Sequence, residues 1–171
     1  PSENYLDRVR KGLVGAKLWS VDRPGEDHDS GYAKVELEQI DIARRMIAKY
    51  PDRLSLALSA GDSRRDFRQG RISSLIGLEG GHAIENSLGA LRMYYALGVR
   101  YMTLTHNVTL DWADAALDSA KHKGLTPFGD SVVREMNRLG MLVGLSHVSP
   151  GPMSAALNVT PAPVVFSPSG A

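Results

Sequence analysis

Three short apolar runs in this chain each end in a residue that can bind a metal ion or move a proton. Residues 74–79 close on Glu79, and two further runs close on His106 and His147. Short apolar runs that end beside glycine or polar residues are typical of buried strands. Three strands that carry possible ligands at the same end therefore indicate one shared site.

Strand and helix signals alternate along the whole chain. Further strand-like runs lie at 12–20, 54–58 and 163–167, and apolar residues recur at helical spacing between most of the strands. Six strands that alternate with five helices predict a parallel sheet with right-handed crossovers and helices outside. Because no G-x-G-x-x-G or P-loop motif is present, a (β/α)8 barrel is favoured over a nucleotide-binding open sheet.

Composition narrows the classes of function. The 171 residues, 43% of them hydrophobic and 23% charged, fit one globular domain or part of one, spanning residues 1–171. A formal net charge of +1 argues against nucleic acid as a partner. The absence of cysteine leaves His, Asp and Glu as metal ligands.

Membrane and targeting signals are also absent from the sequence. No apolar stretch approaches the roughly 18 residues that a membrane span needs, and the polar start does not resemble a signal peptide. The compartment is left open by this pattern, with the cytoplasm slightly favoured.

Several longer motifs follow one another in a fixed order. They occupy residues 15–20, 76–82, 98–107, 112–114, 124–129, 135–141 and 145–149. Together these motifs resemble the membrane, or renal, dipeptidases over essentially the whole chain. That family consists of zinc metallopeptidases with TIM-barrel architecture. The resemblance implies proteolysis of dipeptides by this hydrolase, with tolerance for a D-residue on the C-terminal side.

The resemblance also implies roles for single residues. Glu79 looks like the carboxylate that bridges two zinc ions, and His147 looks like an imidazole ligand of the second ion. His106 is similar to the catalytic, substrate-binding histidine that steadies the oxyanion. A bridging carboxylate lets two cations share a hydroxide that attacks the peptide carbonyl. Trp19 ends the 12–20 strand and is a candidate substrate-binding residue, although a core position is the commoner use of tryptophan.

Each of the three ligand candidates also has a purely structural interpretation. Glu79 is also able to cap a helix, and His147 to be a buried histidine bonded to the backbone, although the family resemblance favours metal ligation for both. His106 is able to hydrogen-bond the long loop that follows it. Among the other histidines, His82 is expected to shape a turn. Exposed loop positions are expected for His28 and His122, and a loop-ordering role for Asp111 and Asp114.

Some positions depart from the family pattern. Pro168 stands where the family has a second metal-binding histidine, and Gly144 stands where an aspartate is usual. The family's opening His-x-Asp metal pair and its last-strand aspartate lie on strands that this chain lacks, so about strands two to seven of the barrel are expected. The alternative is therefore a catalytically silent fragment or pseudo-enzyme. Another metal hydrolase on the same barrel is a third possibility, and a homodimer is expected because open parallel edges favour association.

Overall fold

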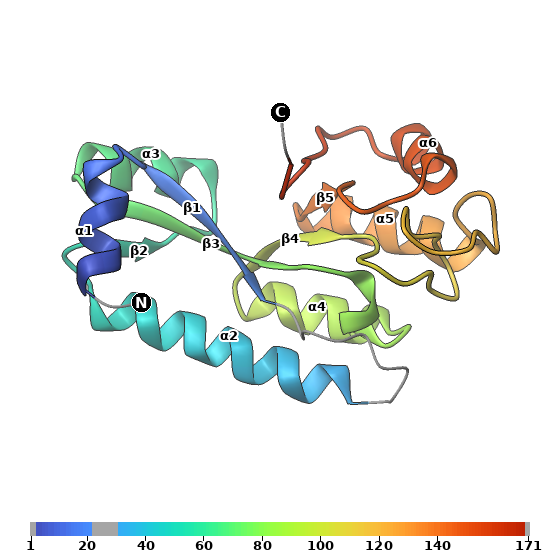
Figure 1. The fold of residues 1–171 in the computed structure, drawn as a ribbon, viewed down its shortest axis with the longest axis horizontal. Coiled ribbons are helices and arrows are strands. Elements are labelled where there is room, and N and C mark those ends of the chain that lie inside the picture. The colour runs from blue at the N-terminus through green and yellow to red at the C-terminus, as the bar shows by residue number, and fades with distance from the viewer. Residues whose placement is uncertain (1–2, 22–30, 170–171) are drawn as a thin grey trace.

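One parallel sheet runs through the computed structural model, which describes residues 3–21 and 31–169 (Figure 1). Every pairing between its strands is parallel, as the alternation of strands and helices predicted. The strands are β1 (Ala16–Val21), β2 (Leu54–Leu56), β3 (Ile72–Leu78), β4 (Val99–Thr103) and β5 (Leu142–Gly144).

The sheet differs in two places from the predicted six strands paired in sequence order. The path is β1-β3-β4-β5, and β2 lies off it, paired with the start of β3, whereas β4 pairs with the end of β3. The sequence also predicted a strand at 163–167, but the structure has a single bridge there, between Gly144 and Val165. Pro163 and Pro168 have no N–H to give to a ladder, which limits the pairing to the neighbourhood of Val165.

Helices gather on one side of the sheet and at its two ends. In Figure 1, α2 and α4 run along the lower side, α1 and α3 lie at one end, and α5 and α6 lie at the other. The helices are α1 (Glu3–Lys11), α2 (Tyr32–Lys49), α3 (Ala60–Arg68), the 3-10 turn η1 (Gly81–Ile84), α4 (Leu88–Ala96), α5 (Pro127–Leu139) and α6 (Pro150–Val159). Helix α1 was not predicted from the sequence, because its apolar stripe is narrow and centres on Leu6, which is 1% exposed.

Side-chain hydroxyl groups cap the beginnings of three of these helices, α3, α4 and α5. Ser87 caps α4 by accepting the backbone N–H of Ala90. The cap of α3 is Ser59, whose hydroxyl accepts the N–H of Asp62. Asp62 in turn accepts from the hydroxyl of Ser59 and from the backbone N–H of Leu58, which holds the chain at the start of α3.

The hydrophobic core lies between the sheet and its helices. Its sheet residues are joined by side chains of α2, α4 and α5, all at most 1% exposed: Ile76, Leu78, Met102, Ile40, Leu91 and Val132. Successive side chains of a strand face opposite sides, so Gly77 and Glu79 face away from this core. The backbone N–H of Glu79 donates to the carbonyl of Val21, so the β1–β3 ladder continues to the residue that carries the carboxylate.

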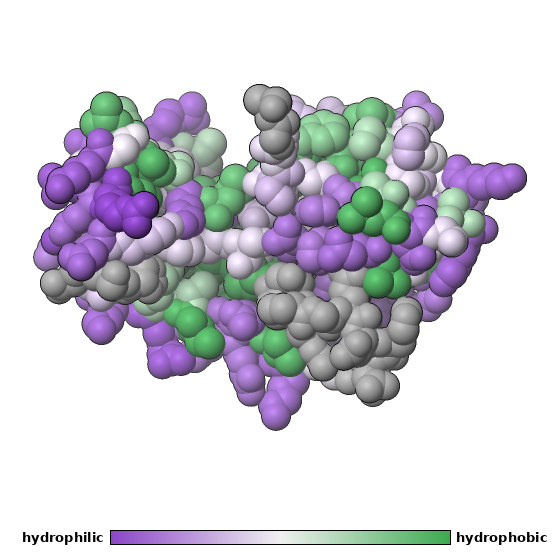
Figure 2. All heavy atoms as spheres, viewed as in Figure 1, coloured by the Kyte–Doolittle hydropathy of each residue, from purple (hydrophilic) through white to green (hydrophobic). Residues whose placement is uncertain are grey.

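The surface mixes polar and apolar side chains. Figure 2 shows separate apolar patches among hydrophilic residues, and the most exposed large apolar side chains are Leu13 at 90% and Leu117 at 79%. Among residues 3–21 and 31–169, no helix combines the length and the apolar character that crossing a bilayer requires.

Candidate metal centre

Glu79, His106 and His147 meet at one edge of the sheet. Each follows the carboxyl end of its strand: Glu79 after β3, His106 after β4 and His147 after β5. One ligand atom from each side chain lies within 4.8 Å of the corresponding atoms of the other two. Parallel strands bring their carboxyl ends to the same edge, which explains why residues so far apart in the sequence come together.

The geometry of these side chains fits a metal ion. Nε2 of His147 lies 3.3 Å from Oε1 of Glu79, and the rings of His106 and His147 meet edge to face with centroids 4.7 Å apart. The side chains of His147 and Glu79 are 25% and 16% exposed. Nε2 of His147 is buried and makes no hydrogen bond with the described part of the chain. Imidazole nitrogen and carboxylate oxygen are both donor types that zinc takes in proteins.

The carboxylate of Glu79 is supported by a side chain that sequence reasoning missed. Oγ of Ser20 donates a 2.7 Å hydrogen bond to Oε2 of Glu79. Oε1 is the oxygen that faces His147, so the two carboxylate oxygens have different neighbours. Ser20 lies near the end of β1 and pairs with Gly77. Its position near a strand end is visible in the sequence. That position places Ser20 beside Glu79 only when the register between β1 and β3 is known.

His147 is held through its backbone. Its φ of 66° lies in the left-handed region, which a residue other than glycine adopts only when its surroundings hold it there. The carbonyl oxygen of His147 accepts two hydrogen bonds, from the backbone N–H of Ala116 at 2.8 Å and from Oγ1 of Thr105 at 3.0 Å. The next residue, Val148, forms a bridge with Ala115.

The loop between β4 and α5 is ordered by Asp114, as the sequence predicted. Asp114 is fully buried, and its carboxylate accepts the backbone N–H groups of Lys121, His122 and Lys123 at 2.7 to 3.1 Å. Burial acts to raise the pKa of Asp114, but these N–H groups outweigh it, so the pKa is lowered. The carbonyl of Asp114 accepts the N–H of Ser149, which ties the loop to the segment after His147.

Two other residues named from the sequence, Trp19 and His82, make contacts that do not involve Glu79. Trp19 faces the side of β1 opposite to Ser20, with the ammonium of Lys17 4.3 Å from its ring centroid. The structure therefore does not bring Trp19 beside Glu79. The ring of His82 packs edge to face on a tyrosine 4.8 Å away, in line with a structural role.

The last positions named from the sequence are Pro168, His122 and His28. Pro168 is close to the centre in space, because its carbonyl accepts a 2.7 Å hydrogen bond from Oγ of Ser146, the neighbour of His147. His122 is an exposed loop residue whose Nε2 lies 3.0 Å from the carbonyl of Leu110. His28 lies outside the described residues.

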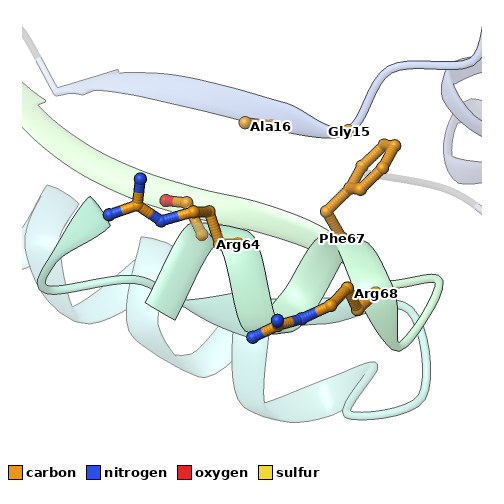
Figure 3. A pocket seen from close by; sticks show the side chains of 6 residues that line it. Gly15, Ala16, Arg64, Phe67 and Arg68 are labelled. Atoms are coloured by element: carbon orange, nitrogen blue, oxygen red, sulfur yellow. The ribbon is translucent and has the colours of Figure 1, made fainter. Parts of the chain in front are cut away.

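A groove of about 460 Å³ lies at the start of β1, far along the strand from Ser20. In Figure 3, Phe67 reaches from α3 toward Gly15, with Arg64 and Arg68 on the same helix. No carboxylate or imidazole lines this groove, so we assign it no part in the chemistry.

Comparisons with known proteins place the chain in a family. The family model described as membrane dipeptidase, peptidase family M19, matches residues 1–171. Dipeptidase 3 of Mus musculus is 46% identical over 174 residues, which cover 99% of this chain and 34% of the relative. Dipeptidase 3 of Rattus norvegicus is also 46% identical, over 99% of this chain and 35% of the relative. The chain thus spans about a third of the length of these curated relatives.

Solved structures share the fold at lower identity. An amidohydrolase from Pseudomonas aeruginosa superposes with a TM-score of 0.84 at 24% identity, covering 96% of this chain and 48% of that one. The probable dipeptidase PvdM from the same organism gives 0.85 at 21%, with 95% and 44% covered. A metallopeptidase from Rhodobacter sphaeroides, liganded with a phosphinate mimic of the dipeptide L-Ala-D-Ala, gives 0.84 at 20%, with 95% and 54% covered. From the match of the family model to the whole chain, together with the 46% identity, we conclude that this protein belongs to the membrane dipeptidase family, peptidase family M19.

Proposed function

We propose that this chain carries part of the active site of a zinc-dependent dipeptidase. In this proposal Glu79 and His147 are metal ligands, and His106 contacts the substrate. The observation that supports it most is the convergence of these three side chains within 4.8 Å at the carboxyl ends of neighbouring strands. Membership of a dipeptidase family supports a dipeptide as the substrate.

The donor set supports zinc. When bound, zinc would polarise the peptide carbonyl and lower the pKa of a bound water toward neutrality. Glu79 has two carboxylate oxygens and is therefore able to bridge two ions, as the sequence resemblance implies. Binding of a second ion, with a hydroxide shared between the two, stays a prediction. The second ion would have one protein ligand fewer than in the family, because Pro168 has no imidazole.

The chain's own side chains have separate tasks in this proposal. Oε1 of Glu79 faces His147 and would hold the zinc ion, while Oε2 accepts the hydrogen bond from Ser20. His106 donates an imidazole N–H to the substrate carbonyl oxygen as that oxygen gains negative charge. The two histidine rings pack against each other, so the position of His106 depends on that of His147.

We infer that the substrate is a dipeptide with a D-residue on its C-terminal side. The Rhodobacter sphaeroides metallopeptidase of the same fold was solved with a mimic of L-Ala-D-Ala, which supports this choice of test compound. The cytoplasmic location and the homodimer stay predictions from the sequence.

Metal content and hydrolysis measured together test the proposal. The purified protein is stripped of metal, reloaded with zinc and assayed for release of D-alanine from L-Ala-D-Ala. We expect bound zinc in the unmodified protein, loss of zinc in Glu79→Gln, and no loss in Glu38→Gln, a control at an exposed position of α2. Turnover of L-Ala-D-Ala would show that the residues of this chain suffice for hydrolysis. Zinc binding without turnover would favour the catalytically silent alternative, and no zinc binding would contradict the metal site.

A further inference from the structure

Ser20, Gly77 and Tyr101 form a row across three strands. Ser20 on β1 is the register partner of Gly77 on β3, and Gly77 is the partner of Tyr101 on β4. Residues that are paired in this way project from the same face of a sheet. The face is the one to which Glu79 belongs, because Glu79 lies two residues beyond Gly77.

Gly77 leaves the space that the ring of Tyr101 occupies. A Cβ built on Gly77 would lie 1.8 Å from Cε1 and 2.1 Å from Cζ of Tyr101. The ring therefore lies directly over the backbone of β3 and directs its hydroxyl toward β1. Any side chain at Gly77 would displace the ring from this path.

The hydroxyls of Tyr101 and Ser20 are neighbours beside Glu79. Oγ of Ser20 donates to Oε2 of Glu79 at 2.7 Å, so the single hydrogen of this hydroxyl is given to the carboxylate. Burial is the main cause that raises the pKa of Tyr101, and the nearby charge of Glu79 adds to it, so the phenol keeps its proton.

We propose that Ser20 and Tyr101 are positioning residues that hold the Glu79 carboxylate toward His147. Ser20 engages one carboxylate oxygen, which leaves the other oxygen 3.3 Å from Nε2 of His147. Tyr101 limits the rotation of the Ser20 hydroxyl. This inference rests on the proposed metal site, and groups that orient a ligand in this way typically change metal affinity by about 10- to 100-fold when they are removed.

Zinc affinity of variants tests the proposal without measuring activity. We expect Ser20→Ala to weaken zinc binding by about tenfold or more, Tyr101→Phe to weaken it less, and Ser20→Thr, which keeps the hydroxyl, to restore it. The controls are Ser131→Ala and Tyr95→Phe, which remove hydroxyl groups from α5 and α4. With cobalt in place of zinc, the visible absorption spectrum should change in Ser20→Ala and stay unchanged in both controls.

Unchanged zinc affinity and an unchanged cobalt spectrum in Ser20→Ala would overturn the inference. Metal-free crystal structures separate this failure from failure of the metal site itself. If the unmodified protein binds no zinc, the proposed function fails, but the position of the Glu79 carboxylate still tests the inference. We expect that carboxylate to leave the neighbourhood of His147 in Ser20→Ala, and an unmoved carboxylate would again overturn the proposal.

Discussion

The two sides of the candidate metal centre are supported in different ways. Glu79 is oriented through its side chain, by the hydroxyl of Ser20. His147 is held through its backbone carbonyl, by Ala116 and Thr105. A side-chain contact is removed by one substitution with a local effect, whereas the backbone contacts depend on the order of a whole loop. The Glu79 side is therefore open to tuning, and the His147 side is tied to the stability of the fold.

The largest effect is expected on the His147 side, from Asp114→Asn. In the unmodified protein the backbone N–H groups share two carboxylate oxygens, whereas the amide of the variant has one acceptor oxygen. Its NH2 group would face these N–H donors, so some buried N–H groups lose their partners. We expect the free energy of unfolding in urea to fall by about 3 kcal/mol, with faster amide exchange at residues 116 and 121–123. The control Asp41→Asn removes an exposed ion pair with Arg45 and should cost less than about 1 kcal/mol. Equal losses in the two variants would contradict the role of Asp114.

The pH dependence of stability sharpens the same test. The folded-state pKa of Asp114 is lowered, so its contribution to stability is present above the unfolded pKa of about 4. That contribution is lost as the pH falls through the folded-state pKa. The difference in unfolding free energy between the unmodified protein and Asp114→Asn should therefore shrink below about pH 4. A difference that stays constant down to the acid limit would show that the carboxylate charge is not its source.

A smaller loss of stability is expected on the Glu79 side, from Gly77→Ala. The added methyl group would overlap the ring of Tyr101, and overpacking of this kind costs about 1 to 3 kcal/mol. Zinc affinity should fall as well, because the displaced ring no longer meets Ser20. Gly124→Ala is the matched control, since a Cβ there meets nothing within 4 Å. If Gly77→Ala unfolds at the same urea concentration as the control, the close approach of Tyr101 is wrong.

The smallest effect is expected from Thr105→Val. This variant removes one of the two donors to the carbonyl of His147 and leaves Ala116 in place, so we expect a loss of about 1 kcal/mol in thermal or urea unfolding. Thr103→Val, two residues earlier at the end of β4, is the control, because the buried hydroxyl of Thr103 has no hydrogen-bond partner among the described residues. That control should be neutral or slightly stabilising. A greater loss from Thr103→Val than from Thr105→Val would reverse the assignment.

The residues that meet at the site were within reach of sequence analysis, and their supports were not. Glu79, His106 and His147 each close an apolar run, and a parallel sheet brings such ends together whatever its detailed register. Ser20 and Tyr101 depend on the registers of β1, β3 and β4, and on a glycine that gives way to an aromatic ring. Strand-to-strand register is a long-range property that one sequence does not display.

The fold class was predicted from the sequence, but the pairing of two short segments was not. Alternating signals are strong enough to indicate a parallel α/β fold of the barrel type, and a parallel sheet with helices beside it is observed. Two short segments were harder: β2 pairs with β3 without joining the main path, and the segment at 163–167 keeps one bridge. Both depend on tertiary contacts, because a run of a few apolar residues has no preference of its own for a central or an outlying position.

Anomalous diffraction from crystals soaked in zinc tests the central claim most directly. We expect a zinc peak within about 2.0 to 2.2 Å of a carboxylate oxygen of Glu79 and of an imidazole nitrogen of His147, with His106 beside it. A zinc peak bound by other residues, or crystals in which these three side chains stay empty of metal at saturating zinc, would contradict the account.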